Sequence, residues 1–379
     1  DEEIVNLALE AKRQGREVYL VTSRDEEVAR TIAARFSFVD GIITSDDATN
    51  SSGAHRAAVI RGRFTGGYDY VGHGPAGLQV WQSARAIIAV APDSATLRKI
   101  RALDKPTTVI EHKSRLRALI EAARLHQWVK NTLIFVPAVL SGTIIEPATA
   151  IKCMLAFFAL GLIAVGTYLV NDLLDIAHDR RHWSKRFRPI AAGDLPIGLA
   201  IAAAAVSIIA GLSVGAAVGS GVLISLTIYL ALTLAYSISL KRLPILDVTV
   251  LATLFTLRIA VGIAAAAVFA SPWLLVFSMT LFASLSIAKR YTEIQRAASK
   301  GEENVPGRGY ITADAPLVLG LGLATGTTSV VILVLFLIFD ALERDIYSNP
   351  RWLWLFPVIM FLWLGRIWLI CQRGQLNDD

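Results

Sequence analysis

Residues 195–240 form a run of 46 that contains no Asp, Glu, Lys or Arg. A membrane-crossing helix needs about 20 apolar residues, so this run is long enough for two crossings. The segment Gly219-Ser220-Gly221 marks the turn between them. Because lipid offers no water to exposed backbone groups, both crossings must be helices. With 54% hydrophobic residues overall, the chain is too apolar for a soluble globular or a disordered protein.

Eight segments in all are apolar enough to cross a bilayer. They are predicted at 128–142, 153–172, 195–217, 220–239, 244–267, 271–289, 313–339 and 350–371. The first is the least apolar, because Lys130 and Asn131 lie within it. The expected fold of this part is an α-helical bundle that passes the membrane many times.

The N-terminal part of the chain has a different character. Half of the charged residues lie in positions 1–125, which are only a third of the chain. Helix patterns at 3–14 and 25–36 alternate with strand patterns at 18–22, 41–44, 68–72 and 86–90. This alternation predicts a small α/β domain with a parallel sheet over residues 1–112. A basic, amphipathic linker at 113–126, suited to a membrane surface, joins it to a membrane domain at 127–379.

The Lys and Arg residues indicate the orientation in the membrane. The loops 173–194, 239–243 and 289–310 and the C-terminal tail carry thirteen, whereas the other side carries only Lys152, Arg344 and Arg351. The positive-inside rule therefore places the first side, and the N-terminal domain, in the cytoplasm of a multi-pass cell-membrane protein. The tryptophans at the expected interfaces are Trp128, Trp273, Trp352 and Trp354.

Several kinds of protein are disfavoured by the composition. The net charge of +6 gives no indication of a nucleic-acid partner, and two cysteines cannot build a disulfide scaffold. The sequence leaves the oligomeric state open, a homo-oligomer included.

Three carboxylates follow the second predicted span. Asp172, Asp175 and Asp179 are spaced i, i+3 and i+7, which places them on one face of a helix. Since like charges repel, a cation is expected among them, and Mg²⁺ prefers such oxygen ligands together with substrate phosphates. The three are therefore predicted as metal-binding, catalytic residues, with Lys185 and Arg188 on the phosphate oxygens. The alternative is a solvated, charged loop, which explains the arginines but not aligned acids beside Asn171 at the end of a span.

Further polar residues lie at or near the cytoplasmic ends of other spans. The predicted substrate-binding set is Lys130, Asn131, Asn171, Lys185, Arg188, Tyr236, Lys241, Arg242, Asp247, Arg258, Lys289, Arg290 and Glu293. Asp247 and Arg258 are eleven residues apart and share a helix face, so a structural ion pair and ligand binding are both open for Arg258. Arg366 in the last span has no evident partner, which favours a structural or snorkelling role.

The motif Asn171-Asp172-x-x-Asp175-x-x-x-Asp179, followed by Lys185-Arg-x-Arg188-Pro189, resembles the first motif of the UbiA superfamily of intramembrane prenyltransferases. The resemblance covers about residues 120–379. It is greatest to the branch that contains decaprenyl-phosphate phosphoribosyltransferase, through His126-Gln-Trp-Val-Lys130-Asn131, Tyr236-Ser-x-x-Leu-Lys241-Arg242, Asp247 and Lys289-Arg290-Tyr-x-Glu293. The family's second motif, DxxxD, is reduced here to one carboxylate, Glu293. The family usually has nine spans, so a ninth would lie beyond Asp379.

The N-terminal segment Val18-Tyr-Leu-Val-Thr22-Ser23-Arg24 resembles the second motif of haloacid-dehalogenase (HAD) phosphatases. His73 and Gly77 occupy the positions of that family's metal-binding carboxylates, Arg56 that of its lysine, and the nucleophilic aspartate motif is not present. The resemblance implies a degenerate HAD-like, Rossmann-type domain with a structural or regulatory role, because the phosphatase chemistry needs that aspartate and Mg²⁺.

The resemblance implies Mg²⁺-dependent transfer of 5-phosphoribosyl from phosphoribosyl pyrophosphate (PRPP) to a polyprenyl phosphate, such as decaprenyl phosphate, for cell-envelope glycolipid precursors. Lys130, Lys185, Arg188 and Lys241 would neutralise the diphosphate. One alternative is transfer of a prenyl group from prenyl diphosphate to an aromatic or other small acceptor, which the missing DxxxD motif disfavours. Another is a transporter or a non-catalytic scaffold, but transporter sites lie near the midplane in broken helices, whereas these polar residues gather in one leaflet.

Overall fold

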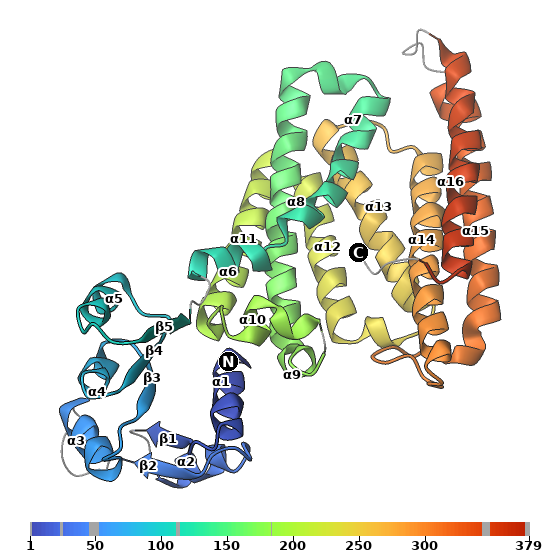
Figure 1. Cartoon of the computed structure of the whole chain (residues 1–379). Helices are drawn as coiled ribbons and strands as arrows, with labels where there is room; N and C mark the ends of the chain where they lie inside the picture. The colour runs from blue at the N-terminus through green and yellow to red at the C-terminus, as the bar shows by residue number, and fades with distance from the viewer. Residues whose placement is uncertain are drawn as a thin grey trace. The chain divides into compact units, whose positions relative to one another are not determined.

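The computed structural model describes residues 2–22, 26–44, 53–110, 114–182, 184–342 and 349–375. It divides the chain into two compact units (Figure 1). The first holds the residues up to 118 together with 192–194, and the second holds 119–191 and 195 onward. Ser23, Arg24, Arg344 and the C-terminal Asp379, which entered the predictions above, lie outside the described residues.

The N-terminal unit is α/β, as the alternating pattern predicts. Its helices are α1 (Glu2–Arg13), α2 (Glu26–Ala33), α3 (Gly53–Arg63), α4 (Leu78–Trp81) and α5 (Ser94–Arg101), and its strands are β1 (Tyr19–Thr22), β2 (Gly41–Thr44), β3 (Asp69–His73), β4 (Ala86–Val90) and β5 (Thr107–Ile110). Every strand pair is parallel. The described strands form two sheets, β1-β2 and β3-β4-β5, where the sequence predicts one. The HAD-like character of this unit stays a prediction.

Apolar packing holds the second sheet of this unit. Trp81 is fully buried beside Ile87 and Ile100, and its indole nitrogen donates to the carbonyl of Tyr70 at 3.1 Å. Asp93 caps α5 by accepting a hydrogen bond from the backbone N–H of Thr96 at 2.6 Å. That hydrogen bond lowers the pKa of the Asp93 carboxyl below its usual range.

The second unit is built from long apolar helices. In the part of the chain that the structure describes, seven are long and apolar enough to cross a membrane: α8 (Pro147–Leu174), α11 (Ile197–Val218), α12 (Ser220–Ile238), α13 (Leu246–Ala266), α14 (Pro272–Ser299), a segment containing α15 (Ala315–Phe336), and one containing α16 (Leu355–Gln372). The turn between α11 and α12 falls at Gly219, as predicted. Figure 1 shows α8 beside α11, and α14, α15 and α16 beside one another.

Short elements connect these helices. They are α6 (Arg115–Ala122), η2 (Leu125–Phe135), α7 (Val136–Leu140), η3 (Thr143–Ile145), α9 (Ile176–Asp179), η4 (Lys185–Phe187), α10 (Pro189–Ala192), η5 (Leu240–Arg242), η6 (Thr312–Asp314), the π-helix η7 (Leu337–Ala341) and η8 (Pro350–Trp354).

The predicted first span at 128–142 is wrong as a regular α-helix. This segment is the 3-10 helix η2 followed by the five-residue α7, with Arg124 in the left-handed region before it. Pro137 cannot donate a backbone hydrogen bond, and a 3-10 helix rises about 2.0 Å per residue against 1.5 Å for an α-helix. The 11 residues of η2 and five of α7 therefore cover roughly 30 Å, the thickness of a hydrocarbon core. The segment is therefore long enough to cross with fewer residues than an α-helix would need, and the predicted eighth crossing stays a prediction.

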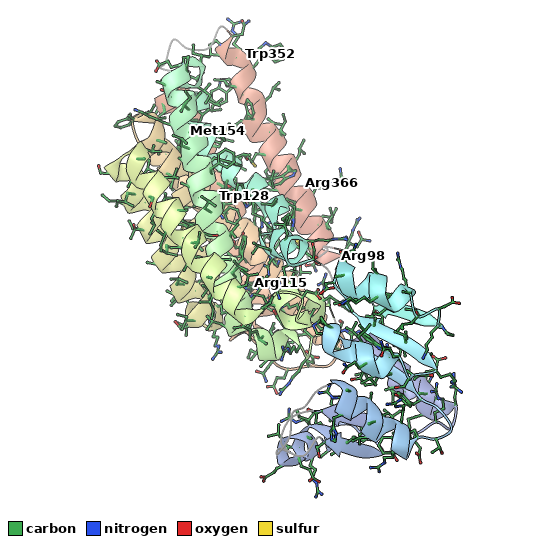
Figure 2. All side chains as sticks on the ribbon, turned by 90° about the vertical axis from the view of Figure 1, so that its left-hand side faces the viewer. Arg98, Arg115, Trp128, Met154, Trp352 and Arg366 are labelled. Atoms are coloured by element: carbon green, nitrogen blue, oxygen red, sulfur yellow. The ribbon has the colours of Figure 1, made fainter. Side chains whose placement is uncertain are left out.

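Contacts along α8 place this segment in the bundle. Arg124, just before η2, binds Asp172 near the end of α8, whereas Glu146, after η3, accepts a hydrogen bond from Thr149 at its beginning. Trp128 packs between these ends against Gly161, Phe157 and Phe158 (Figure 2). Trp128 thus packs along α8, and its predicted interfacial position stays a prediction.

Candidate functional site

The first acidic motif lies where α8 ends. The helix stops at Leu174, Asp175 follows with a backbone conformation outside the helical region, and α9 resumes at Ile176. The side chains of Asp172 and Asp179 are only 2% exposed, whereas that of Asp175 is 28% exposed. Two acids of the motif are thus enclosed, and one is open to a ligand.

Three cations neutralise these carboxylates. Arg124 donates to both carboxylate oxygens of Asp172, at 2.6 and 2.7 Å. Arg188 bridges two acids, donating to Asp172 at 3.1 Å and to Asp179 at 2.7 Å. Lys241 donates to both oxygens of Asp175 at 3.2 Å. The close spacing of the three acids predicts a cation among them. Arg124, Arg188 and Lys241 provide this positive charge, and they come from three separate parts of the chain.

The donor set fits the chemistry of a hard cation. Carboxylate oxygens on neighbouring turns, with Asn171 beside them, are the ligands that Mg²⁺ takes, usually together with phosphate oxygens. Among the described residues, no group of three or more His, Cys, Asp or Glu converges as in a closed metal site. Within the described ranges the Asp175 side chain pairs with Lys241 alone, and it is the most accessible of the three. A metal here would be shared with a ligand's phosphate oxygens.

A second charged network joins α13 and α14. The fully buried Asp247 accepts a hydrogen bond from the Arg290 guanidinium and another from the Tyr310 hydroxyl, the latter at 2.8 Å. Arg290 also pairs with Glu293, and Arg308 approaches the same carboxylate at 3.7 Å. The hydroxyl of Tyr236 accepts from Arg290 at 3.3 Å and from Arg308 at 3.2 Å. These acids are thus committed to arginines within the protein.

Tyr310 is buried and keeps the hydroxyl proton with which it hydrogen-bonds to Asp247. The hydroxyl also accepts a hydrogen bond from the backbone N–H of Ile245 at 2.7 Å. Removal from water, together with the neighbouring carboxylate, raises the pKa of Tyr310 well above its usual range. Tyr310 therefore stays a neutral donor at physiological pH.

Asp247 and Arg258 do not pair, so the structural ion pair left open in the sequence is wrong. Eleven residues along α13 correspond to about 16 Å, too far for contact even on a shared face. The Arg258 side chain instead donates to Asn131 at 3.3 Å, to the carbonyl of Leu254 at 2.7 Å and to the Tyr229 hydroxyl at 3.1 Å. Its guanidinium also lies over the rings of Tyr229 and Phe255.

The remaining predicted residues fall around these groups. Lys130 is exposed and lies within electrostatic range of Arg258 and Lys289. The backbone carbonyl of Asn171 accepts from the N–H of Asp175 at 3.0 Å. Lys185, in η4, is near His182, and Arg242, in η5, is exposed; neither contacts the three carboxylates within the described ranges.

Several residues at the site escape sequence reasoning. Arg124, Tyr229, Arg308 and Tyr310 contact the predicted residues, but none was selected as a site residue. The sequence places Arg124 only within the basic linker at 113–126. The excess of acids in the first motif is the one signal that pointed to missing cations.

Comparisons with known proteins give the family. The model of the UbiA prenyltransferase family matches residues 132–379. The uncharacterized protein y4nM of Sinorhizobium fredii is 37% identical over all of this chain and 74% of its own length. Nodulation protein NoeC of Azorhizobium caulinodans is 32% identical over 68% of this chain and 84% of its own. Decaprenyl-phosphate phosphoribosyltransferase of Mycolicibacterium smegmatis is 37% identical over 50% of this chain and 61% of its own.

A solved structure supports the fold of the second unit. A UbiA homologue from Archaeoglobus fulgidus, bound to GPP and Mg²⁺, aligns with a TM-score of 0.52 over 68% of this chain and 98% of its own, at 16% identity. At that identity the likeness concerns the fold alone. The matched family model, the relatives and the apolar helices agree: this chain is a multi-pass membrane protein that belongs to the UbiA prenyltransferase family.

Proposed function

We propose that this chain transfers 5-phosphoribosyl from PRPP to a polyprenyl phosphate at the cytoplasmic face of the cell membrane. The observation that carries the proposal is a difference between the acids at the end of α8 and those of the α13–α14 network. The two sets differ in accessibility and in the cations that bind them. At the end of α8, Asp175 is accessible and held only by a lysine at 3.2 Å. In the network of α13 and α14, Asp247 and Glu293 are bound to Arg290. Asp175 is thus a carboxylate that no arginine holds within the described ranges, whereas Asp247 and Glu293 are both bound by one. Asp175 would serve a metal and a diphosphate, and the second network offers no comparable acid, which disfavours a donor gripped by two such groups.

The chemistry needs positioning and charge rather than a protein nucleophile. The bond between ribose C1 and the diphosphate oxygen breaks as positive charge develops on C1, and an oxygen of the lipid phosphate forms the new bond. The products are the polyprenyl phosphoribose 5-phosphate and diphosphate. Lys241 and Arg188 would stabilise the charge on the leaving diphosphate.

The metal has a defined place in this proposal. Asp172, Asp175 and Asp179 would hold Mg²⁺, which when bound neutralises the diphosphate oxygens and makes them a better leaving group. Lys185 and Arg242 are within the same cytoplasmic region and would attract the anionic donor.

The relatives support this assignment in part. Decaprenyl-phosphate phosphoribosyltransferases are 36–37% identical to about half of this chain. The second candidate is transfer of a prenyl group from prenyl diphosphate to a small acceptor. It is favoured by the fold shared with the homologue bound to GPP and Mg²⁺. A transporter or scaffold is disfavoured, because members of the family are transferases.

The N-terminal unit takes no part in the proposed reaction. We keep the predicted limits of 1–112 for a degenerate HAD-like domain, 113–126 for the linker and 127–379 for the transferase. The same proposal places the N-terminal domain in the cytoplasm, with a structural or regulatory role.

The test uses the purified chain, Mg²⁺, a polyprenyl phosphate and PRPP labelled in the ribose. Label should pass into the organic phase, and Asp175→Asn should reduce this by at least a hundredfold. Glu146→Gln is the matched control, since Glu146 is an exposed carboxylate at the opposite end of the same helix. Label transfer that persists in Asp175→Asn would contradict the assigned metal site. No transfer by the unaltered chain would contradict the function.

A further inference from the structure

Arg258 is a buried cation held by uncharged groups. Its residue is 6% exposed, and its hydrogen bonds go to an amide, a carbonyl and a hydroxyl. Within the described ranges, no carboxylate pairs with it. A charge held inside a membrane bundle is costly unless an opposite charge meets it, and such residues mark ligand or ion pathways. The arrangement therefore calls for an anion.

Counting residues along α13 and along η2 gives a similar depth in the membrane for Arg258 and for its partner Asn131. Arg258 is eleven residues along α13 from Asp247, about 16 Å. Asn131 is seven residues along the 3-10 segment from Arg124, about 14 Å. Counted from Asp247 and Arg124, which the predicted orientation places at the cytoplasmic face, both values are close to half of the roughly 30 Å hydrocarbon core. The position is thus well separated in depth from the carboxylates at the end of α8.

Two neighbours of Arg258 have hydrogen-bond donors or charge that are available to an anion. Asn131 is 2% exposed, and its side-chain nitrogen is buried with no hydrogen-bond partner. Lys130, the preceding residue, makes no ion pair among the described residues and lies within electrostatic range of Arg258 and Lys289. Cations brought together in this way repel one another, and an unsatisfied amide N–H is a further cost. A bound phosphate would remove both penalties.

We infer that Arg258, Asn131 and Lys130 bind the phosphate of the lipid acceptor; we call this group the mid-depth phosphate site. The assignment to an acceptor rests on the proposed function. It changes the role predicted for Lys130, from neutralising the donor to binding the acceptor. Two phosphate subsites then serve the two substrates at different depths.

The surroundings favour a lipid over a soluble ligand. The Arg258 guanidinium lies over the rings of Tyr229 and Phe255, at a depth where an attached hydrocarbon chain is in its own solvent. Tyr168 links the two subsites, because its ring lies under Arg124 and it is within electrostatic range of Arg258. A donor held at the carboxylates and a phosphate held at Arg258 would therefore meet near Tyr168.

The experiment measures binding without turnover, on the full chain in nanodiscs. Farnesyl phosphate and Mg²⁺–PRPP are titrated separately into the unaltered chain, Arg258→Met and Asp175→Asn. Arg258→Met should weaken farnesyl phosphate binding at least tenfold and change PRPP binding less than twofold. Asp175→Asn should do the reverse. Arg366→Met is the control, since Arg366 lies on the exposed face of α16 (Figure 2).

A second pair of variants covers the case in which Arg258→Met does not fold. Lys130→Met should weaken farnesyl phosphate several-fold, whereas Lys152→Met, an exposed lysine at the other end of α8, should have no effect. The inference is overturned if Arg258→Met or Lys130→Met weakens PRPP and not farnesyl phosphate. It is also overturned if inorganic phosphate binds as tightly as the lipid. Lipid binding that depends on Arg258 without any PRPP turnover would support the site and reject the proposed function.

Discussion

Asp172 is held by arginines from both sides, Arg124 before the first crossing and Arg188 after α9. With a side chain only 2% exposed, it depends on these partners for its charge. Arg124→Leu should therefore lower the free energy of unfolding by about 1–3 kcal/mol, because Arg188 compensates only in part. Melting in detergent is the measurement, with Arg117→Leu on the exposed face of α6 as the control. An unchanged melting temperature in Arg124→Leu would show that the Arg124–Asp172 ion pair does not stabilise the fold.

The Tyr310 hydroxyl stabilises the buried Asp247 by donating a hydrogen bond to it. Tyr310→Phe should lower the free energy of unfolding by about 1–3 kcal/mol at neutral pH, since Asp247 loses a donor and the N–H of Ile245 an acceptor. Because the folded state raises the pKa of Tyr310, this stabilisation is complete below the unfolded pKa of about 10 and is lost as the pH rises above it. The melting temperatures of the two forms should thus converge at alkaline pH. Tyr19→Phe, at an exposed hydroxyl, should show no such convergence.

At the scale of residues, the sequence predicted the acids better than their partners. Asp172, Asp175 and Asp179 are recognisable because they lie close together in the sequence, although the structure breaks the predicted single helix at Asp175. Arg124 and Lys241 are 48 and 66 positions from the acids that they bind. No local spacing carries that information. Arg258, for which an ion pair and ligand binding were both open, likewise contacts Asn131 and Tyr229, which are distant in sequence.

At the scale of elements, η2 packs closely against α13. A Cβ added at Gly262 in α13 would overlap the backbone carbonyl of Ile134 in η2. Gly262→Ala should therefore lower the free energy of unfolding by about 1–3 kcal/mol or more, and reduce the yield of folded protein. Gly320→Ala in α15 is the matched control, because no atom lies within 4 Å of its added Cβ. Equal melting temperatures for both variants would contradict this close packing.

Hydrophobic length explains which elements were predictable. The seven long helices follow from runs of apolar residues, since a bilayer allows few other structures. The segment 128–142 is also largely apolar but forms a different helix, and composition does not distinguish a 3-10 rise from an α rise. In the N-terminal unit, β5 and the division into two sheets were missed, because strand pairing depends on contacts distant in sequence.

For the whole molecule, the orientation in the membrane is a prediction that labelling can test. Both native cysteines are buried, so an introduced cysteine reports without background. In right-side-out vesicles, Ile145→Cys should react with a membrane-impermeant maleimide, since Ile145 is 85% exposed between η2–α7 and α8. Ser299→Cys, at the exposed end of α14, should react only after the membrane is opened. The opposite pattern would reverse the assigned orientation.

The identity of the donor is the claim on which the account depends. One tube should contain the purified chain, Mg²⁺, PRPP, a prenyl diphosphate, a polyprenyl phosphate and an aromatic acid, with the products resolved by mass spectrometry. We predict a polyprenyl phosphate enlarged by one phosphoribosyl group, with one diphosphate released for each product molecule. A prenylated aromatic acid with unchanged polyprenyl phosphate would contradict the account and establish the prenyltransferase alternative.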